Sequence, residues 1–229
     1  MKAMILAAGF GERLRPLTAT TPKPLLVVGG KPLIQHHIEK LAAAGVRDLV
    51  INTAWLGEKI ESFLGDGDAF GVRIAWSREG SPLETGGGIW RALPLLGTAP
   101  FLVINGDVWT DFPLPTLTTM EWSQDCDAHL VLVPNPPHHA SGDFGLDARG
   151  RIANNGAEAL TFSGVSVMRP ELFTGYGADA EKFPLRPVLD AAIRRDRVSG
   201  EFYTGRWCDV GTVERLRALD EFLCSSRHV

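Results

Sequence analysis

The sequence predicts an α/β protein with a doubly wound, Rossmann-like and mostly parallel sheet. Two observations predict this class. Short apolar runs alternate with amphipathic helical patterns over about the first 125 residues, which is the spacing of strand–helix–strand units. Several of these runs are hydrophobic at consecutive positions, as in strands that are buried on both faces. Beyond residue 125 the pattern changes to shorter β segments, so we expect a β-rich second half.

The predicted elements follow in a regular order. We expect strands over residues 4–7, 48–52, 72–76 and 101–104, separated by helices over 32–44, 56–64 and 87–93. Pro32 lies in the first turn of the first helix and Gly45 ends it, which are the positions that these residues favour. The second half is expected to hold a strand over 128–133, β segments over 142–151 and 160–168, a helix over 185–195, a strand over 198–203 and a closing helix over 213–223.

Composition excludes several classes of function. The 229 residues are 45% hydrophobic, which is enough for one domain of ordinary size. A formal charge of -4 argues against a nucleic-acid module, which normally shows a basic stripe. No apolar stretch approaches the roughly 18 residues of a membrane span. Three widely spaced cysteines indicate reduced thiols in a cytoplasmic protein.

A glycine-containing loop follows the first predicted strand. Gly9 and Gly11 allow backbone N–H groups to approach a phosphate closely. Arg13 follows, and ten residues later Lys23 stands between two prolines. Leu14 replaces the third glycine of a dinucleotide fingerprint, and the Gly-Lys-Ser/Thr of a Walker loop is absent. The segment therefore predicts two fixed cations that neutralise charge on a polyphosphate and on departing pyrophosphate.

Two aspartates are candidates for a metal site. Asp107 follows the predicted strand 101–104, at the edge where open parallel sheets bind ligands, and Gly106 allows a turn that aims it inward. Asp209 precedes the last predicted helix. Two carboxylates suit Mg²⁺, which keeps several waters and also binds substrate phosphates. Taken alone, each aspartate is equally compatible with an ordinary turn or a helix N-cap.

Together these motifs resemble the signature of the sugar-1-phosphate nucleotidylyltransferases. The signature comprises Gly-x-Gly-x-Arg-x-x-Pro-Leu-Thr over residues 9–18 and Pro-Lys-Pro-Leu over 22–25, and the likeness continues through 29–34, 105–107 and 207–212. The resemblance implies a GT-A-like nucleotidyltransferase fold, Mg²⁺ as cofactor, and a nucleoside triphosphate and a sugar 1-phosphate as substrates. It also implies one domain, in which residues 1–125 bind the nucleotide and residues 126–229 bind the sugar phosphate.

The resemblance implies roles for individual residues. Arg13, Lys23 and Asp107 would act in catalysis, and Asp107 and Asp209 would hold the metal. Base recognition would fall to residues 83–88, where three consecutive glycines, which are costly in a helix, indicate a need for close backbone approach. The residues implied for nucleotide binding are Leu6, Ala7, Ala8, Gly9, Gly11, Glu12, Arg13, Lys23, Glu79, Glu84, Thr85, Gly86 and Asn105. Those implied for sugar binding are Asn52, Asp143, Glu158, Ser163, Gly164 and Lys182.

One departure from the family pattern concerns the sugar phosphate. Many relatives carry Glu-Lys-Pro where this chain has Glu-Ala-Leu over residues 158–160, so the lysine is missing. Lys182 and Arg186 are the candidates to replace it. His138 and His139 follow two prolines and are expected to lie in a solvated loop. None of the six histidines falls in a matched motif, which predicts direct displacement without a covalent nucleotidyl-enzyme.

Within the family, the substrates are predicted from three segments. Residues 53–57, 82–88 and 105–111 resemble the short uridylyltransferases that act on N-acetylmuramic acid 1-phosphate in bacterial cell-wall recycling. Mannose-1-phosphate guanylyltransferase and glucose-1-phosphate thymidylyltransferase are the alternatives. A non-catalytic nucleotide-sensing homologue is a further alternative, but it would be expected to lose a metal aspartate or the loop arginine. We expect no nucleic-acid or membrane partner, and a monomer or small homo-oligomer.

Overall fold

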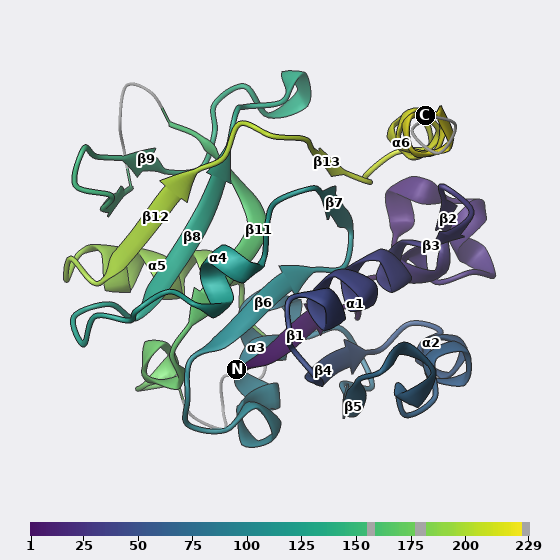
Figure 1. The fold of residues 1–229 in the computed structure, drawn as a ribbon, viewed down its shortest axis with the longest axis horizontal. Helices are drawn as coiled ribbons and strands as arrows, with labels where there is room; N and C mark the ends of the chain where they lie inside the picture. The colour runs from purple at the N-terminus through teal and green to yellow at the C-terminus, as the bar shows by residue number, and fades with distance from the viewer. Residues whose placement is uncertain (155–158, 177–181, 226–229) are drawn as a thin grey trace.

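The computed structural model describes residues 1–154, 159–176 and 182–225. Its centre is a seven-stranded sheet in the order β12-β8-β11-β6-β1-β4-β5 (Figure 1). All neighbours in this sheet pair in parallel except that β11 runs antiparallel to both β6 and β8. The predicted mostly parallel sheet is therefore confirmed. The strand bounds are Lys2–Leu6 for β1, Asp48–Thr53 for β4, Arg73–Arg78 for β5, Phe101–Asn105 for β6, Ala128–Val133 for β8, Thr161–Met168 for β11 and Val198–Phe202 for β12.

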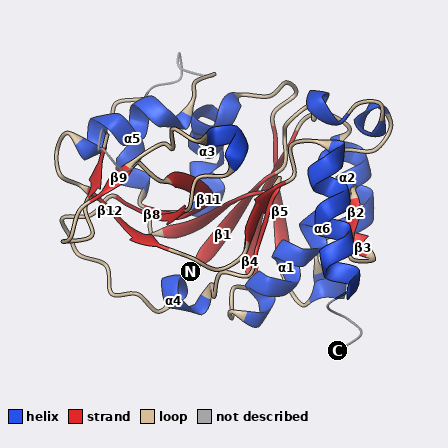
Figure 2. Ribbon diagram, turned by 90° about the horizontal axis from the view of Figure 1, so that it is seen from above, coloured by secondary structure: helices blue, strands red, loops and turns tan. Residues whose placement is uncertain are grey.

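Helices cover both faces of the sheet (Figure 2). On β1, Ala3 and Ile5 belong to one buried apolar cluster and Met4 to the other, because successive side chains of a strand point to opposite faces. The first cluster includes residues of α1 and α2, and the second includes residues of α3 and α5. The helix bounds are Leu33–Ala43 for α1, Gly57–Leu64 for α2, Glu84–Leu96 for α3, Pro115–Thr118 for α4, Leu185–Ile193 for α5 and Val213–Ser225 for α6.

Three two-stranded ribbons lie outside the central sheet. Strand β7 (Val108–Thr110) pairs with β13 (Trp207–Asp209) and so joins the two halves of the chain. Strand β2 (Val27–Val28) pairs with β3 (Lys31–Pro32), and β9 (Gly145–Leu146) with β10 (Ile152–Ala153). The last helix, α6, lies beside the β2–β3 ribbon (Figure 1). The N–H of Gly29 donates to Asp220 Oδ1 of α6 over 2.7 Å.

The helix expected from Gly87 begins three residues earlier, so Glu84, Thr85 and Gly86, expected to precede it, form the first turn of α3. Glycine costs helix stability through its backbone freedom, but packing outweighs that cost here. A Cβ at Gly86 would lie 2.8 Å from the carbonyl oxygen of Pro184, and one at Gly88 would lie 2.7 Å from Glu79 Oε1. The glycines therefore allow α3 to approach α5 and the end of β5 closely.

The remaining elements agree with the sequence apart from their bounds. The expected β segment over 142–151 is reduced to the short strand β9, with a turn leading to β10. Short 3-10 turns lie between these elements: Glu12–Leu14 (η1), Leu17–Ala19 (η2), Lys23–Leu25 (η3), Asp68–Phe70 (η4), Pro137–His139 (η5) and Pro170–Phe173 (η6). Among the residues described, no helix is both long and apolar enough to cross a membrane.

Candidate active site

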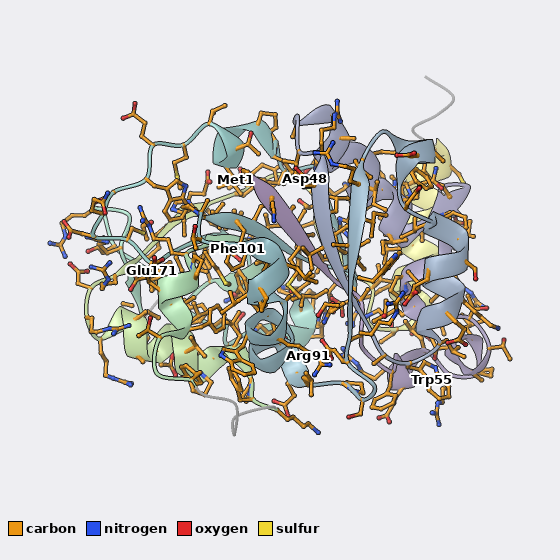
Figure 3. All side chains as sticks on the ribbon, turned by 90° about the horizontal axis from the view of Figure 1, so that it is seen from below. Met1, Asp48, Trp55, Arg91, Phe101 and Glu171 are labelled. Carbon is orange, nitrogen blue, oxygen red and sulfur yellow. The ribbon has the colours of Figure 1, made fainter. Side chains whose placement is uncertain are left out.

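A cavity of about 630 Å³ opens at the carboxyl ends of β1, β4 and β6. Figure 3 shows Met1 and Asp48, at the amino ends of β1 and β4, on the opposite edge of the molecule from Trp55, which follows β4. The carboxyl edge is where an open parallel sheet binds its ligand. The described lining residues are Leu6, Ala7, Ala8, Gly9, Phe10, Gly11, Glu12, Arg13, Leu14, Lys23, Pro24, Asn52, Glu79, Pro82, Glu84, Thr85, Asn105, Gly106, Asp107 and Gly211.

The loop after β1 curves around one wall of this cavity. Gly11 has a φ of 66°, which side chains rarely allow, and a Cβ there would lie 2.9 Å from Thr18 Cγ2. The Thr18 hydroxyl donates to the carbonyl oxygen of Gly11 over 2.7 Å, which holds the turn. Arg13 is exposed at the cavity wall. The loop thus presents backbone groups and one guanidinium group to the cavity.

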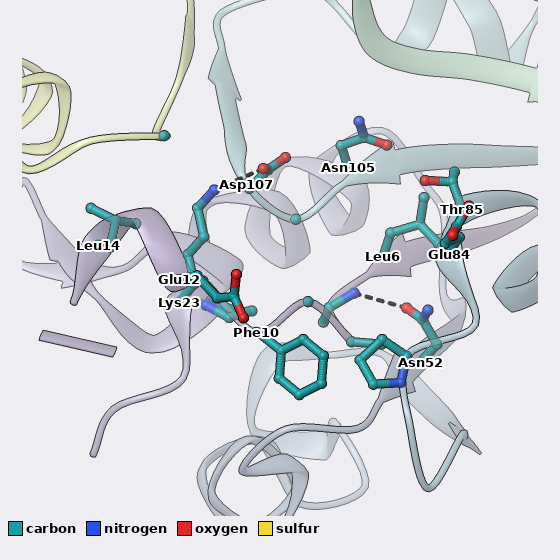
Figure 4. A pocket seen from close by; sticks show the side chains of 18 of the residues that line it. Leu6, Phe10, Glu12, Leu14, Lys23, Asn52, Glu84, Thr85, Asn105 and Asp107 are labelled. Carbon is teal, nitrogen blue, oxygen red and sulfur yellow. Dashed lines mark hydrogen bonds and ion pairs between the residues drawn. The ribbon is translucent and has the colours of Figure 1, made fainter. Parts of the chain in front are cut away.

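A lysine and an aspartate form an ion pair at the cavity wall (Figure 4). Lys23 Nζ lies 2.7 Å from Asp107 Oδ2. Lys23 starts η3, between Pro22 and Pro24, and is only 9% exposed. Asp107 follows a tight turn in which the N–H of Gly106 donates to the carbonyl oxygen of Leu6 over 2.9 Å. A Cβ at Gly106 would overlap that same oxygen, so the turn requires glycine.

A buried hydrogen-bonded chain forms another wall. The N–H of Ala7 donates to Asn52 Oδ1 over 2.8 Å, and Asn52 Nδ2 donates to Glu79 Oε1 over 2.6 Å. Glu79 Oε2 accepts from the N–H of Leu83 over 2.9 Å. Burial raises the pKa of Glu79, and these two donors partly oppose that effect. Asn52, which the sequence assigns to the sugar, therefore ties the glycine loop to the predicted base-binding carboxylate.

Asp209 ends β13, beside the turn that carries Asp107. Its Cα is paired with that of Val108, and the N–H of Val210 donates to the carbonyl oxygen of Asp107 over 2.8 Å. Asp209 Oδ2 lies 2.9 Å from Arg215 Nη2, and Oδ1 lies 3.0 Å from His138 Nε2. Neither contact has hydrogen-bond angles, so Oδ1 is buried without a hydrogen-bond partner. The two predicted metal aspartates are thus neighbours along one ribbon.

The predicted sugar-binding residues are less concentrated. Asp143 Oδ2 accepts from the N–H of Phe162 over 2.8 Å, and Oδ1 lies 3.0 Å from His139 Nε2. Ser163 is buried in β11, and Gly164 fits against Asn105, where a Cβ would lie 2.7 Å from Nδ2. Of the described sugar candidates, only Asn52 lines the cavity, and Lys182 is exposed. Glu158 lies outside the described residues.

Arg186, the other candidate for the missing lysine, also lies away from the cavity lining. Its guanidinium group stacks over Phe144 at 4.4 Å, and Nε donates to Asp190 Oδ1 over 2.7 Å. His138 and His139 lie in an exposed turn, as the sequence predicts, but each also lies 3.0 Å from a carboxylate oxygen of Asp209 or Asp143. The His138–Asp209 contact joins residues that are distant in sequence, so no local pattern predicts it, whereas His139 and Asp143 are only four residues apart.

Most of the predicted nucleotide-binding residues are brought together by the fold. All of them except Gly86, which is buried in α3, line the cavity. Sequence reasoning missed Phe10, Pro82 and Gly211, which also line it. Phe10 is 43% exposed and packs 6.1 Å from Trp55 between ring centroids. Its place between Gly9 and Gly11 was the available signal.

Comparison with known proteins identifies a matching family and several similar enzymes. Residues 2–162 match the family described as nucleotidyl transferase. The chain is 56% identical over 95% of its length to N-acetylmuramate alpha-1-phosphate uridylyltransferase of Neisseria meningitidis, covering 96% of that protein. It is 37% identical to the enzyme of the same name from Caulobacter vibrioides, with 91% of each chain covered. A mannose-1-phosphate guanyltransferase of Gibberella zeae is 32% identical over 92% of this chain and 61% of that protein.

A solved structure shares the fold at lower identity. A putative glucose-1-phosphate thymidylyltransferase from Bacillus anthracis, in complex with a sucrose, superposes with a TM-score of 0.85 at 23% identity. The alignment covers 98% of this chain and 95% of that chain. At this identity the likeness concerns the fold.

Proposed function

We propose that this chain acts on UTP and N-acetylmuramic acid 1-phosphate. The premise is that the chain belongs to the nucleotidyl transferase family and is a sugar-1-phosphate nucleotidylyltransferase. The products are the UDP-sugar and pyrophosphate. Identity supports this choice of substrates, because it is 56% to a uridylyltransferase of that name, of which the chain covers 96%, and 32% and 45% to two mannose-1-phosphate guanyltransferases, of which it covers 61%. The observation that carries the reaction class is the Lys23–Asp107 pair beside the glycine loop.

The reaction follows from charge. A sugar phosphate is already an anionic nucleophile at neutral pH, so no general base is needed to deprotonate it. Its oxygen attacks the α-phosphorus of the triphosphate, and the bond to the pyrophosphate oxygen breaks. Arg13 and Lys23 lower the repulsion between the two polyanions and stabilise the negative charge that grows on pyrophosphate. The walls of the cavity must also hold the reacting atoms about 3 to 3.5 Å apart and in line.

A divalent cation fits the carboxylates of the β7–β13 ribbon. Asp209 Oδ1 is a buried oxygen without a hydrogen-bond partner, and Asp107 belongs to the adjoining turn. Within the described residues, no group of three or more acidic, histidine or cysteine side chains forms a metal cluster. That fits Mg²⁺, which takes one or two protein carboxylates and completes its shell with water and phosphate. When bound, Mg²⁺ supplies Lewis-acid stabilisation of phosphate charge.

The remaining assignments belong to the same proposal. Residues 1–125 hold the triphosphate and base, and residues 126–229 hold the sugar phosphate within one domain. The relatives' substrate supports a role in the recycling of peptidoglycan sugars. The three cysteines are free, which agrees with the reducing cytoplasm, where we expect the protein to work.

The test is a matrix of substrates. Pyrophosphate release is measured with each of four nucleoside triphosphates against several sugar 1-phosphates, with Mg²⁺ or with a chelator. We expect the highest kcat/KM for UTP with N-acetylmuramic acid 1-phosphate and no turnover with the chelator. Preference for GTP with mannose 1-phosphate would replace the substrate assignment, and no release with any pair would contradict the reaction class.

Direct displacement makes a stereochemical prediction. One in-line attack inverts the configuration at the α-phosphorus, whereas a covalent nucleotidyl-enzyme would invert it twice. With a chirally labelled α-thiotriphosphate, we expect the product to show inversion. Net retention would require a nucleophile on the protein.

A further inference from the structure

An arginine with unpaired donors lies behind the proposed metal aspartate. Arg215 Nη2 is 2.9 Å from Asp209 Oδ2, and both side chains are largely buried. Among the residues described, Arg215 Nε and Nη2 and Asp209 Oδ1 are buried without hydrogen-bond partners. Buried polar atoms are normally satisfied, so such a group of them requires an explanation. The pair is held together by charge and leaves Asp209 Oδ1, which lies 3.0 Å from His138 Nε2, without a hydrogen bond.

The segment between the two residues is built to let them meet. The Thr212 hydroxyl accepts from the N–H of Arg215 over 3.3 Å, as an N-cap of α6 does. A Cβ at Gly211 would overlap Arg215 Nη2 and would lie 3.1 Å from Asp209 Oδ2. Gly211 does not have a positive φ, so glycine is required here for space. The guanidinium group passes through that space to reach back to the carboxylate.

The helix that carries Arg215 is held in place by the first half of the chain. Helix α6 packs its apolar face, including Leu219, against Val28 and Leu33. Asp220 of the same helix accepts from the N–H of Gly29. Gly211 itself lines the cavity. Arg215 is therefore held by a rigid helix immediately behind the cavity wall.

We propose that Arg215 is a positioning residue for Asp209: it holds Oδ2, so that Oδ1 is presented to a divalent cation. The inference rests on the proposed function, which assigns Asp209 to the metal. Gly211 supports the same contact, because only glycine leaves space for the guanidinium group of Arg215 to reach Asp209. Partners behind a metal ligand fix its orientation, and their loss typically weakens metal binding about 10- to 100-fold.

The test measures metal binding without turnover. Free Mn²⁺ is titrated by electron paramagnetic resonance in the presence of a non-hydrolysable UTP analogue. Wild type is compared with Arg215→Ala, Arg215→Lys and Gly211→Ala. Arg217→Ala is the matched control, because Arg217 is exposed on the same helix. Asp209→Asn reports on the metal assignment itself, and circular dichroism and thermal melting show that each variant is folded.

We expect Arg215→Ala and Gly211→Ala each to weaken Mn²⁺ binding about 10- to 100-fold, and Arg217→Ala to match wild type. Arg215→Lys keeps the charge but not the guanidinium contact, so it should also bind Mn²⁺ more weakly. Adding Gly211→Ala to Arg215→Ala should cause no further loss, because both changes remove the same contact. If Arg215→Ala fails to fold, Gly211→Ala is read in its place, since its Cβ would displace the flexible end of Arg215 and would meet Asp209 Oδ2 only at 3.1 Å.

Two outcomes overturn parts of this proposal separately. The role of Arg215 alone would be refuted if folded Arg215→Ala binds Mn²⁺ as tightly as wild type or more tightly while Asp209→Asn binds it weakly. If Arg215→Ala fails to fold, the same result in Gly211→Ala would refute that role. Wild-type binding in Asp209→Asn would refute the metal assignment of the proposed function, and the role of Arg215 with it.

Discussion

The two halves of the molecule contribute to the cavity in different ways. Every described lining residue up to Asp107 lies on or just after a strand, a tight turn or the start of α3, whereas Gly211 is the sole described lining residue from the second half. In the first half, one local segment such as residues 6–14 supplies a whole wall. In the second half, distant segments meet in pairs, such as His138 with Asp209 and Trp207 with Ser163.

This difference has a physical origin. Parallel strands end at the same edge of a sheet, so residues that follow them converge whatever the loops between them do. The second half instead includes the antiparallel strand β11 and the short ribbons β9–β10 and β7–β13, whose ends do not share an edge. Its polar groups reach their partners through long-range contacts. Four predictions test this division, from the largest expected effect to the smallest.

The largest effect is expected where the halves meet, at Asp107. Asp107→Asn removes a carboxylate from the proposed metal site and from Lys23, so turnover should fall about 100- to 1,000-fold, or about 3 to 4 kcal/mol in the activation free energy. Steady-state rates of pyrophosphate release measure this loss. Asp68→Asn, an exposed change in η4, serves as control. Near-normal turnover of folded Asp107→Asn in excess Mg²⁺ would remove Asp107 from the site.

A second effect concerns the stability of the nucleotide half. His37 is buried in α1, and burial lowers its pKa from 6.5 to about 4. Between these values the unfolded chain binds a proton that the folded chain refuses, so the free energy of unfolding should fall as pH falls from 6.5 to 4. Above pH 6.5 both states are neutral and this loss disappears. The difference amounts to about 3 kcal/mol.

Urea unfolding of wild type and His37→Gln across this pH range measures that contribution. Glutamine carries no charge at any of these pH values, so the variant should show a shallower loss of stability on acidification. Both proteins contain the same carboxylates, whose titration cancels in the comparison. Identical pH profiles for the two proteins would show that His37 does not stay neutral in the fold.

Much of the first half could be predicted from sequence, and the reasons for the misses are particular. The four strands predicted for the first half lie within two residues of β1, β4, β5 and β6, because consecutive apolar residues mark a doubly buried strand, whereas the short strands β2, β3 and β7 were not predicted. The start of α3 was missed because the cost of its glycines was weighed without the tight packing of Gly86 and Gly88. The contacts of His138 and Arg215 with Asp209 depend on how the ribbon and α6 fold back. Local sequence patterns do not predict such contacts.

The third effect distinguishes binding from catalysis within the glycine loop. Arg13 lines the cavity and is exposed there. If its charge acts mainly as pyrophosphate leaves, Arg13→Ala should lower kcat roughly 30-fold, corresponding to about 2 kcal/mol, and change the KM for UTP little. Arg15→Ala is the matched control, an exposed arginine of the same loop. A rise in KM at constant kcat would make Arg13 a binding residue only.

The smallest effect tests whether the second half reads the sugar. Both oxygens of Asp143 already have partners, the N–H of Phe162 and the imidazole of His139, but each keeps a further lone pair for a sugar hydroxyl. Asp143→Asn should therefore raise the KM for the sugar 1-phosphate about tenfold, or about 1.4 kcal/mol, and leave the KM for UTP unchanged. Asp147→Asn is the matched control, because Asp147 lies in the same segment and bonds only to its own turn among the described residues. If Asp143 has only a structural role, Asp143→Asn would instead lower the melting temperature and change both KM values together. That result would contradict the proposal that the second half binds the sugar, at the residue that tests it most specifically.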